Sequence, residues 1–388
     1  MRNGWIQGVL ALAILGGSTL MVRGEGEKVS ALPAAITAPA IVVRPQTEAE
    51  KKGIDFLLTK QDKTTGAWLP QVGPAVTAMV VKGLINGGKA VDDPAIVKAL
   101  EFIETCHQKD GGYYKDSNPN YNSAVVLSMF AAIPGDKYKT QIKGLQEFLK
   151  SLQQLEGKTD NKGVKITKDH PWYGGAGYGE DRPDLSNTSY FIEALHDSGA
   201  PADDPAIQKA LIFVTRSQML GETNDQAFAK SATDGGFIYT PAAGGESKFG
   251  DIDKLEGDSQ LRSYGSMTYA GFKSLLYAGL TDKDPRVSAA VKWIQNNWTL
   301  EFNPGSSSFD GQYYFYHAFA RAMHAYGKDT IIDAKNVKHD WRKELNDALA
   351  ASQAADGSWV NPKSPRWFEG NPILVTAYGI LCLEEARK

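Results

Sequence analysis

Cysteine is nearly absent from this chain, because only Cys106 and Cys382 occur among its 388 residues. Two thiols cannot form the set of disulfides that stabilises small secreted domains, so packing must hold the fold together. Both cysteines lie among apolar residues, where a free thiol behaves as a small hydrophobic group. We therefore expect two buried free thiols, and a single disulfide between them is the alternative in an oxidising compartment.

The chain also lacks an excess of charge of either sign. Its 42 Lys and Arg residues nearly balance its 45 Asp and Glu residues, and they form no basic stripe. Proteins that bind nucleic acid concentrate positive charge against the phosphate backbone. We therefore expect no nucleic-acid partner.

The one long apolar run lies at the N-terminus. Arg2 precedes the apolar residues 5–22, and residues 22–24 are of the kind that a signal peptidase reads. We expect a signal peptide at residues 1–24, cleaved after Gly24, that exports the protein to the periplasm or the extracellular space. Retention as a membrane anchor is the alternative, because the run approaches the roughly 18 to 20 residues of a membrane span.

Residues 25–46 are rich in Ala and Pro and have no hydrophobic periodicity, which is typical of a linker. The folded body is therefore expected at residues 47–388. Apart from the signal segment, we expect no contact with a membrane.

Three segments of this body are near-copies of one another. They read DDPAIVKALEFI at 92–103, DDPAIQKALIFV at 203–214 and DKDPRVSAAVKWI at 282–294. In each, an Asp supplies an N-cap oxygen and the following Pro takes the first helical position, where its missing N–H is not needed. Apolar residues then follow at i, i+4 and i+7, which predicts a helix with one buried face.

Glycine turns with an aromatic residue separate these helices from a second set of apolar helices. The turns read QDKTTGAW at 61–68 and QAADGSW at 353–359, and variants of them recur between these two. Six helix–turn–helix hairpins can be counted in this way. Because such hairpins bury their apolar faces only against neighbours, they predict a single body.

These repeats resemble those of squalene and oxidosqualene cyclases and of protein prenyltransferase β subunits. The resemblance covers residues 47–388. It implies an all-α fold, an (α/α)6 toroid of six helical hairpins around a central cavity. We expect a monomer without a cofactor, whose cavity accepts a small-molecule or polymer ligand.

The resemblance also directs attention to the acid of class II terpene cyclases, an Asp-x-Asp-Asp motif ahead of a helix. The segment DLSN at 184–187 has a similar placement, ahead of a helix expected at 190–197, but keeps only the first carboxylate. Ser186 and Asn187 replace the others, and a hydroxyl group is far too weak an acid to protonate an alkene. Asp184 is thus the candidate catalytic residue, as a weaker acid, and helix capping is its alternative role.

Prenyltransferase β subunits instead bind zinc through Asp, Cys and His. A catalytic zinc site needs about three converging protein ligands. Neither cysteine lies in an Asp-x-Cys arrangement, and His317 and His324 have no cysteine near them in sequence. We predict no metal site.

The longest insertion, residues 220–265, is a candidate lid and carries an acidic cluster of Asp251, Asp253, Glu256 and Asp258. Its spacing departs from the EF-hand pattern. A solvated loop is the simplest interpretation, and a calcium site or a substrate contact is the alternative.

Aromatic residues near the expected turn-to-helix junctions supply candidate ligand contacts. In a toroid these junctions gather at one end, where rings suit an isoprenoid, a sugar or a cation. Filling of the barrel core is the alternative role. The candidates, together with one amide, are Trp172, Tyr173, Asn187, Tyr190, Tyr264, Tyr313, Tyr314 and His317.

Three functions stay open. The first is an exported, cyclase-like protein whose cavity binds an apolar or ring-containing ligand, with lyase or isomerase chemistry undecided. The second is a cell-envelope scaffold that binds a polymer or a partner. The third is a polysaccharide lyase or hydrolase, in which the separation of carboxylates such as Asp184 and Asp251 would decide the mechanism. We favour the first.

Overall fold

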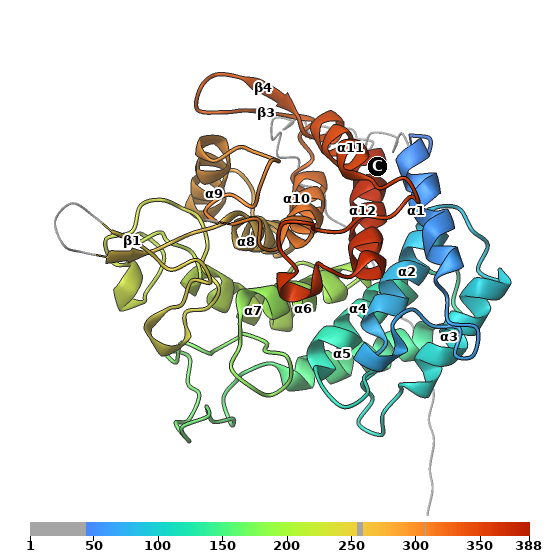
Figure 1. The fold of residues 1–388 in the computed structure, drawn as a ribbon. Helices are drawn as coiled ribbons and strands as arrows, with labels where there is room; N and C mark the ends of the chain where they lie inside the picture. The colour runs from blue at the N-terminus through green and yellow to red at the C-terminus, as the bar shows by residue number, and fades with distance from the viewer. Residues whose placement is uncertain (1–43, 254–258, 307) are drawn as a thin grey trace, which may run out of the picture. The chain divides into compact units, whose positions relative to one another are not determined.

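Twelve α-helices and four short strands form the described part of the chain, residues 44–253, 259–306 and 308–388 of this computed structural model (Figure 1). The predicted signal peptide, nearly all of the predicted linker, and both Glu256 and Asp258 lie outside the described residues. Two antiparallel hairpins contain the strands. They are β1 (Asp251–Asp253) with β2 (Ser259–Leu261), and β3 (Thr330–Ile332) with β4 (Lys338–Asp340).

The helices alternate along the chain between an outer and an inner ring. The outer helices are α1 (Glu48–Thr59), α3 (Pro94–Thr105), α5 (Lys139–Leu152), α7 (Pro205–Arg216), α9 (Pro285–Asn296) and α11 (Trp341–Ser352). The inner helices are α2 (Ala75–Asn86), α4 (Pro119–Ala132), α6 (Leu185–Asp197), α8 (Gly265–Tyr277), α10 (Gln312–Tyr326) and α12 (Pro372–Arg387).

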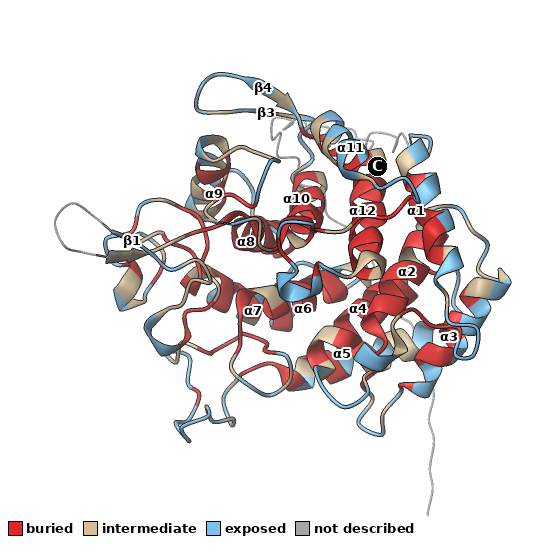
Figure 2. Ribbon diagram, in the orientation of Figure 1, coloured by how far each residue is buried: buried red, intermediate tan, exposed pale blue. Residues whose placement is uncertain are grey.

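The inner ring closes on itself. Each inner helix packs against the next one along the chain, from α2 to α12, and α12 packs back against α2. Inner helices are buried around most of their surface, whereas outer helices bury one face and expose the other (Figure 2). This arrangement confirms the predicted (α/α)6 toroid.

The three near-copies in the sequence are the outer helices α3, α7 and α9. Asp93, Asp204 and Asp284 cap them, and each accepts a hydrogen bond from the second helical N–H at 2.9, 2.8 and 2.9 Å. Their predicted apolar faces pack into the core, since both Ile96 and Ile207 are fully buried. The local pattern of Asp, Pro and apolar residues therefore specifies where these helices begin and how they face.

A repeated glutamine side chain connects each of four hairpins, through hydrogen bonds, to the outer helix that follows it around the ring. Gln353 shows the geometry, because its Nε2 donates to the carbonyl of Gly357 at 2.9 Å and to that of Ala49 in α1 at 2.8 Å. The same bridge is made by Gln61 to α3, Gln153 to α7 and Gln218 to α9. Because the Gln353 bridge joins the last hairpin to the first, the toroid is also closed at its periphery.

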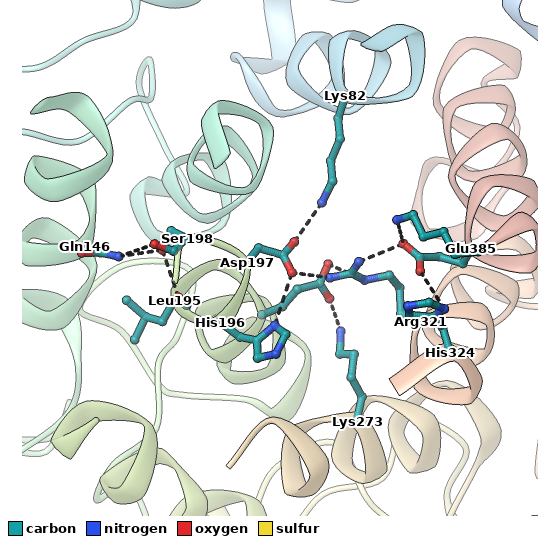
Figure 3. Close-up of polar contacts among 12 residues, drawn as sticks. Lys82, Gln146, Leu195, His196, Asp197, Ser198, Lys273, Arg321, His324 and Glu385 are labelled. Carbon is teal, nitrogen blue, oxygen red and sulfur yellow. Dashed lines mark hydrogen bonds and ion pairs between the residues drawn. The ribbon is translucent and has the colours of Figure 1, made fainter. Parts of the chain in front are cut away.

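Charged side chains fill the axis at the C-terminal ends of the inner helices (Figure 3). Arg321 of α10 lies at the centre of this cluster, and its guanidinium contacts three buried or nearly buried carboxylates. These are Glu193 at 3.1 Å, Asp197 at 2.7 Å and Glu385 at 2.9 Å. Lys82 of α2 pairs with Asp197 and Lys273 of α8 pairs with Glu193, so the cluster connects five of the six inner helices.

Candidate binding cavity

A cavity of about 360 Å³ lies at the other end of the inner ring, where the inner helices begin. All six inner helices contribute residues from their first two turns. Examples are Ala75, Tyr121, Ser186, Ser266, Tyr314 and Leu374. Because six helix N-termini converge here, their macrodipoles add partial positive charge around the cavity.

The cavity wall is rich in aromatic residues. Seven of its 19 lining residues are tyrosines. Tyr190 stacks against Tyr314 with ring centroids 6.3 Å apart, and Tyr121 meets Tyr190 edge-on at 5.2 Å. Val76 and Met267 add aliphatic surface between the rings. The wall therefore offers apolar ring faces together with phenolic hydroxyl groups.

Asp184 lies directly behind this wall. It caps α6, which begins at Leu185 rather than at the predicted residue 190, because the Asp184 carboxylate accepts from the backbone N–H of Asn187 at 2.9 Å. Asn187 Nδ2 also donates to it at 2.8 Å. Burial raises the pKa of Asp184 to about 6, although the hydrogen bonds from Asn187 and Tyr239 oppose this shift. No described Lys, Arg or His forms an ion pair with this carboxyl group.

Two polar residues of α6 line the cavity beside the tyrosines. The hydroxyl groups of Ser186 and Tyr314 are hydrogen-bonded at 2.8 Å, which joins α6 to α10. Asn187 is oriented by its bond to Asp184, and its Oδ1 has no hydrogen-bond partner among the described residues. Buried polar atoms are almost always paired, so this oxygen is an unsatisfied acceptor.

The long insertion contributes to the mouth of the cavity. Tyr239 and Lys248 from the insertion line it, and the Lys248 ammonium lies 4.2 Å from the centroid of the Tyr239 ring. The backbone N–H of Leu185 donates to the carbonyl of Tyr239 at 2.8 Å, which fixes the insertion against the start of α6. Asp251 is exposed at the start of β1 and does not line the cavity, and Asp253 ends the same strand.

The structure brings together half of the predicted ligand contacts. Asn187, Tyr190, Tyr264 and Tyr314 all line the cavity, and their role in binding stays a prediction. Tyr121 and Tyr378 were missed, although Tyr121 is the third residue of its inner helix, as Tyr314 is of α10. That shared position was the signal that could have identified it.

The other four predicted contacts lie outside the cavity lining. Trp172 and Tyr173 pack in a separate small cluster with Ile166, and Tyr313 is buried with its ring edge-on to Tyr316. His317 is buried beneath the cavity, where its ring stacks with that of Tyr190 at 6.5 Å. Burial lowers the pKa of His317 to about 4, so its imidazole is neutral at physiological pH.

Cys106 and Cys382 are buried free thiols, and burial raises the pKa of each. Within residues 44–253, 259–306 and 308–388, no group of three His, Cys, Asp or Glu side chains is placed to hold a metal ion. In the same residues, no helix combines the length and apolar character needed to cross a bilayer.

Solved structures with the same architecture are known, although no protein-family model and no curated protein matches the chain. The type II terpene cyclase MstE from Scytonema, in complex with geranylgeranyl dihydroxybenzoate, is 16% identical with a TM-score of 0.51, over 87% of this chain and 96% of that one. An α-1,6-mannanase of Salegentibacter, in complex with α-1,6-mannotriose, is 11% identical with a TM-score of 0.53, over 88% of this chain and 98% of that one.

The chain is an α/α toroid. This likeness to a cyclase structure agrees with the predicted resemblance at the level of the fold. Because the identities are low, the likeness establishes the fold of this toroid and nothing about its chemistry.

Proposed function

We propose that this toroid is an exported protein that binds an apolar or ring-containing small molecule in its tyrosine-lined cavity. The observation that carries the proposal is the lining itself, in which seven tyrosines surround about 360 Å³ of free volume. Ligand pockets in proteins typically enclose roughly 300–1,000 Å³ behind apolar and aromatic walls. The proposal that the protein is exported is supported only by the apolar run near the N-terminus.

The unpaired Oδ1 of Asn187 supports a ligand with at least one hydrogen-bond donor. The two solved structures with this fold hold geranylgeranyl dihydroxybenzoate and α-1,6-mannotriose, which both contain rings. Neither complex identifies the ligand of this chain.

Acid catalysis is the second candidate function. Asp184 is a buried carboxyl group with a pKa raised to about 6, and it contacts Tyr239, which lines the cavity. A proton could pass from Asp184 to a bound ligand through the Tyr239 hydroxyl group. The described lining contains no Asp or Glu, and Asp251 is not part of it, so an acid–base pair of Asp184 with Asp251 has no support.

Recovery of the natural ligand tests the proposal. The protein is purified from its native envelope, and native mass spectrometry identifies retained lipids and glycans, while N-terminal sequencing locates the predicted cleavage after Gly24. We expect a ring-containing or apolar molecule that the Tyr190→Ala variant retains at a tenth of the wild-type occupancy or less. Tyr114→Ala, which removes a tyrosine outside the cavity lining, is the control. Equal retention by Tyr190→Ala and wild type would exclude the cavity as the binding site.

The same experiment separates binding from catalysis. Asp184→Asn should retain the ligand at wild-type occupancy. If this variant accumulates a molecule that the wild-type protein converts to another mass, or to an isomer that chromatography separates, the second candidate is supported.

A further inference from the structure

We infer that Trp367 and Phe368 form a second ligand subsite at the mouth of the cavity, and that the ligand is an amphiphile whose head group carries a ring. This inference rests on the proposed function and specifies the ligand. Both residues line the cavity from a short 3₁₀ segment, Arg366–Phe368, that precedes α12.

Both residues have left-handed backbone conformations, with φ of 55° at Trp367 and 67° at Phe368. A positive φ is a true outlier for bulky side chains, and two consecutive cases strain the backbone. Strain of this kind persists only where the surrounding structure enforces it, and it concentrates at ligand sites.

Glu369 enforces the conformation from the C-terminal side of the pair. Its side chain is fully buried and accepts hydrogen bonds from the backbone N–H groups of Tyr313 at 2.9 Å and Tyr314 at 2.8 Å. Asn361 Nδ2 donates to its second oxygen at 2.8 Å. Glu369 thus caps α10 and fixes the backbone that follows Phe368.

The N-terminal side of the pair is fixed as well. Arg366 forms an ion pair with Asp310 at 2.9 Å. The Trp367 ring lies against Gly311, where an added Cβ would come within 2.8 Å of it, and meets Phe249 edge-on at 5.9 Å. The segment is therefore held rigidly in a strained form.

Core packing does not explain why these rings are held, because 42% of Trp367 and 46% of Phe368 is exposed. Exposed ring faces beside a cavity suit stacking on a second ring. Lys248 at the mouth and the nearby pair of Arg182 with Glu246 offer polar partners for such a head group. Val76, Met267 and Leu374 in the same lining are buried aliphatic side chains and match a hydrocarbon part.

Saturation-transfer difference NMR with n-octyl β-D-glucoside, below its critical micelle concentration, tests this inference. In the wild-type protein, both octyl and glucose protons should receive saturation. In Trp367→Gly, we expect the glucose signals to fall and affinity to weaken roughly three- to tenfold through loss of one stacked ring. The melting temperature should change little, because glycine adopts this φ without strain and the relief of strain offsets the lost contacts of the ring with Gly311 and Phe249.

Asn336→Gly is the matched control, because Asn336 also has a positive φ, 62°, but lies in the turn between β3 and β4 outside the cavity lining. It should leave both sets of signals unchanged. Phe368→Gly is the second test variant, with the same expected result as Trp367→Gly.

Unchanged glucose signals in both test variants would overturn the inference. It would also be overturned if octyl and glucose signals fell together with the melting temperature, since the residues would then be structural. Absence of octyl binding by the wild-type protein would instead overturn the proposed function.

Discussion

At the scale of single residues, Asp184 experiences two opposing effects. Its hydrogen bonds as the N-cap of α6 favour the ionised carboxylate, whereas burial without a basic partner favours the neutral acid. Burial dominates, since the pKa is raised from 3.8 to about 6. Between these two values the folded protein binds more protons at this site than the unfolded chain does. Asp184 therefore makes the folded state less stable as pH rises from about 4 to 6.

Asp184→Asn should remove this pH dependence, because the amide stays neutral while its oxygen can still cap α6. Relative to the wild-type protein, we expect the variant to gain up to about 3 kcal/mol in free energy of unfolding between pH 4 and pH 7. Urea denaturation of both proteins across this range measures the difference. A constant difference would mean that Asp184 has an ordinary pKa in the folded state.

At the scale of elements, the repeated glycine and glutamine join one hairpin to the next. Gly357 has a φ of 86°, and a Cβ at this position would lie 2.4 Å from the backbone oxygen of Lys52 in α1. Only glycine allows the turn to approach α1 so closely, which keeps the carbonyl of Ala49 in α1 within reach of Gln353 Nε2.

Gly357→Ala should therefore lower the free energy of unfolding by roughly 2–5 kcal/mol, from backbone strain and steric overlap together. Gly88→Ala is the matched control, because Gly88 has a φ of 90° but nothing within 4 Å of the added methyl group. It should cost about 1–2 kcal/mol, from the backbone alone. Urea denaturation of both variants measures the contrast, and equal losses would show that the contact with α1 carries no energy.

The sequence predicts those elements whose signals are local. The Asp-Pro caps of α3, α7 and α9 lie within two residues of the N–H groups they bind, so the pattern alone locates these helices. In contrast, α10 is capped by Glu369, 55 residues away from Tyr314, and no local pattern reveals such a partner. The left-handed backbone of Trp367 was equally unpredictable from the sequence, because tryptophan rarely adopts a positive φ.

At the scale of the whole molecule, parallel inner helices divide the toroid into two different ends. The N-terminal end holds the cavity, whose tyrosines come from separate helices, from the insertion and from the loop before α6. The repeats predict a closed ring with such an end, but they do not predict which side chains meet inside it. The C-terminal end holds the charged cluster, whose members come from five helices that are far apart in the sequence and therefore gave no local signal.

Arg321 is the residue on which the charged end depends (Figure 3). Its charge opposes the burial of Glu193, Asp197 and Glu385, so that the pKa of each is held below its ordinary value, with that of Glu193 at about 2. Carboxylates with lowered pKa values stabilise the fold above their unfolded pKa of about 4 to 4.5, and this stability is lost as pH falls towards 2.

Arg321→Met should lower the free energy of unfolding at pH 7 by about 3–5 kcal/mol, because buried carboxylates lose their main partner. Without the positive charge of Arg321, burial raises the pKa values of these carboxyl groups. The variant should therefore recover part of its loss as pH decreases from 7 towards 5, a range in which the wild-type carboxylates do not titrate.

Arg342→Met, which breaks an ion pair with the exposed Asp329, is the control and should cost no more than about 1 kcal/mol from the ion pair. Urea denaturation at several pH values measures both variants. A pH-independent loss in Arg321→Met would indicate that Arg321 acts through packing and that its charge does not keep the central carboxylates ionised.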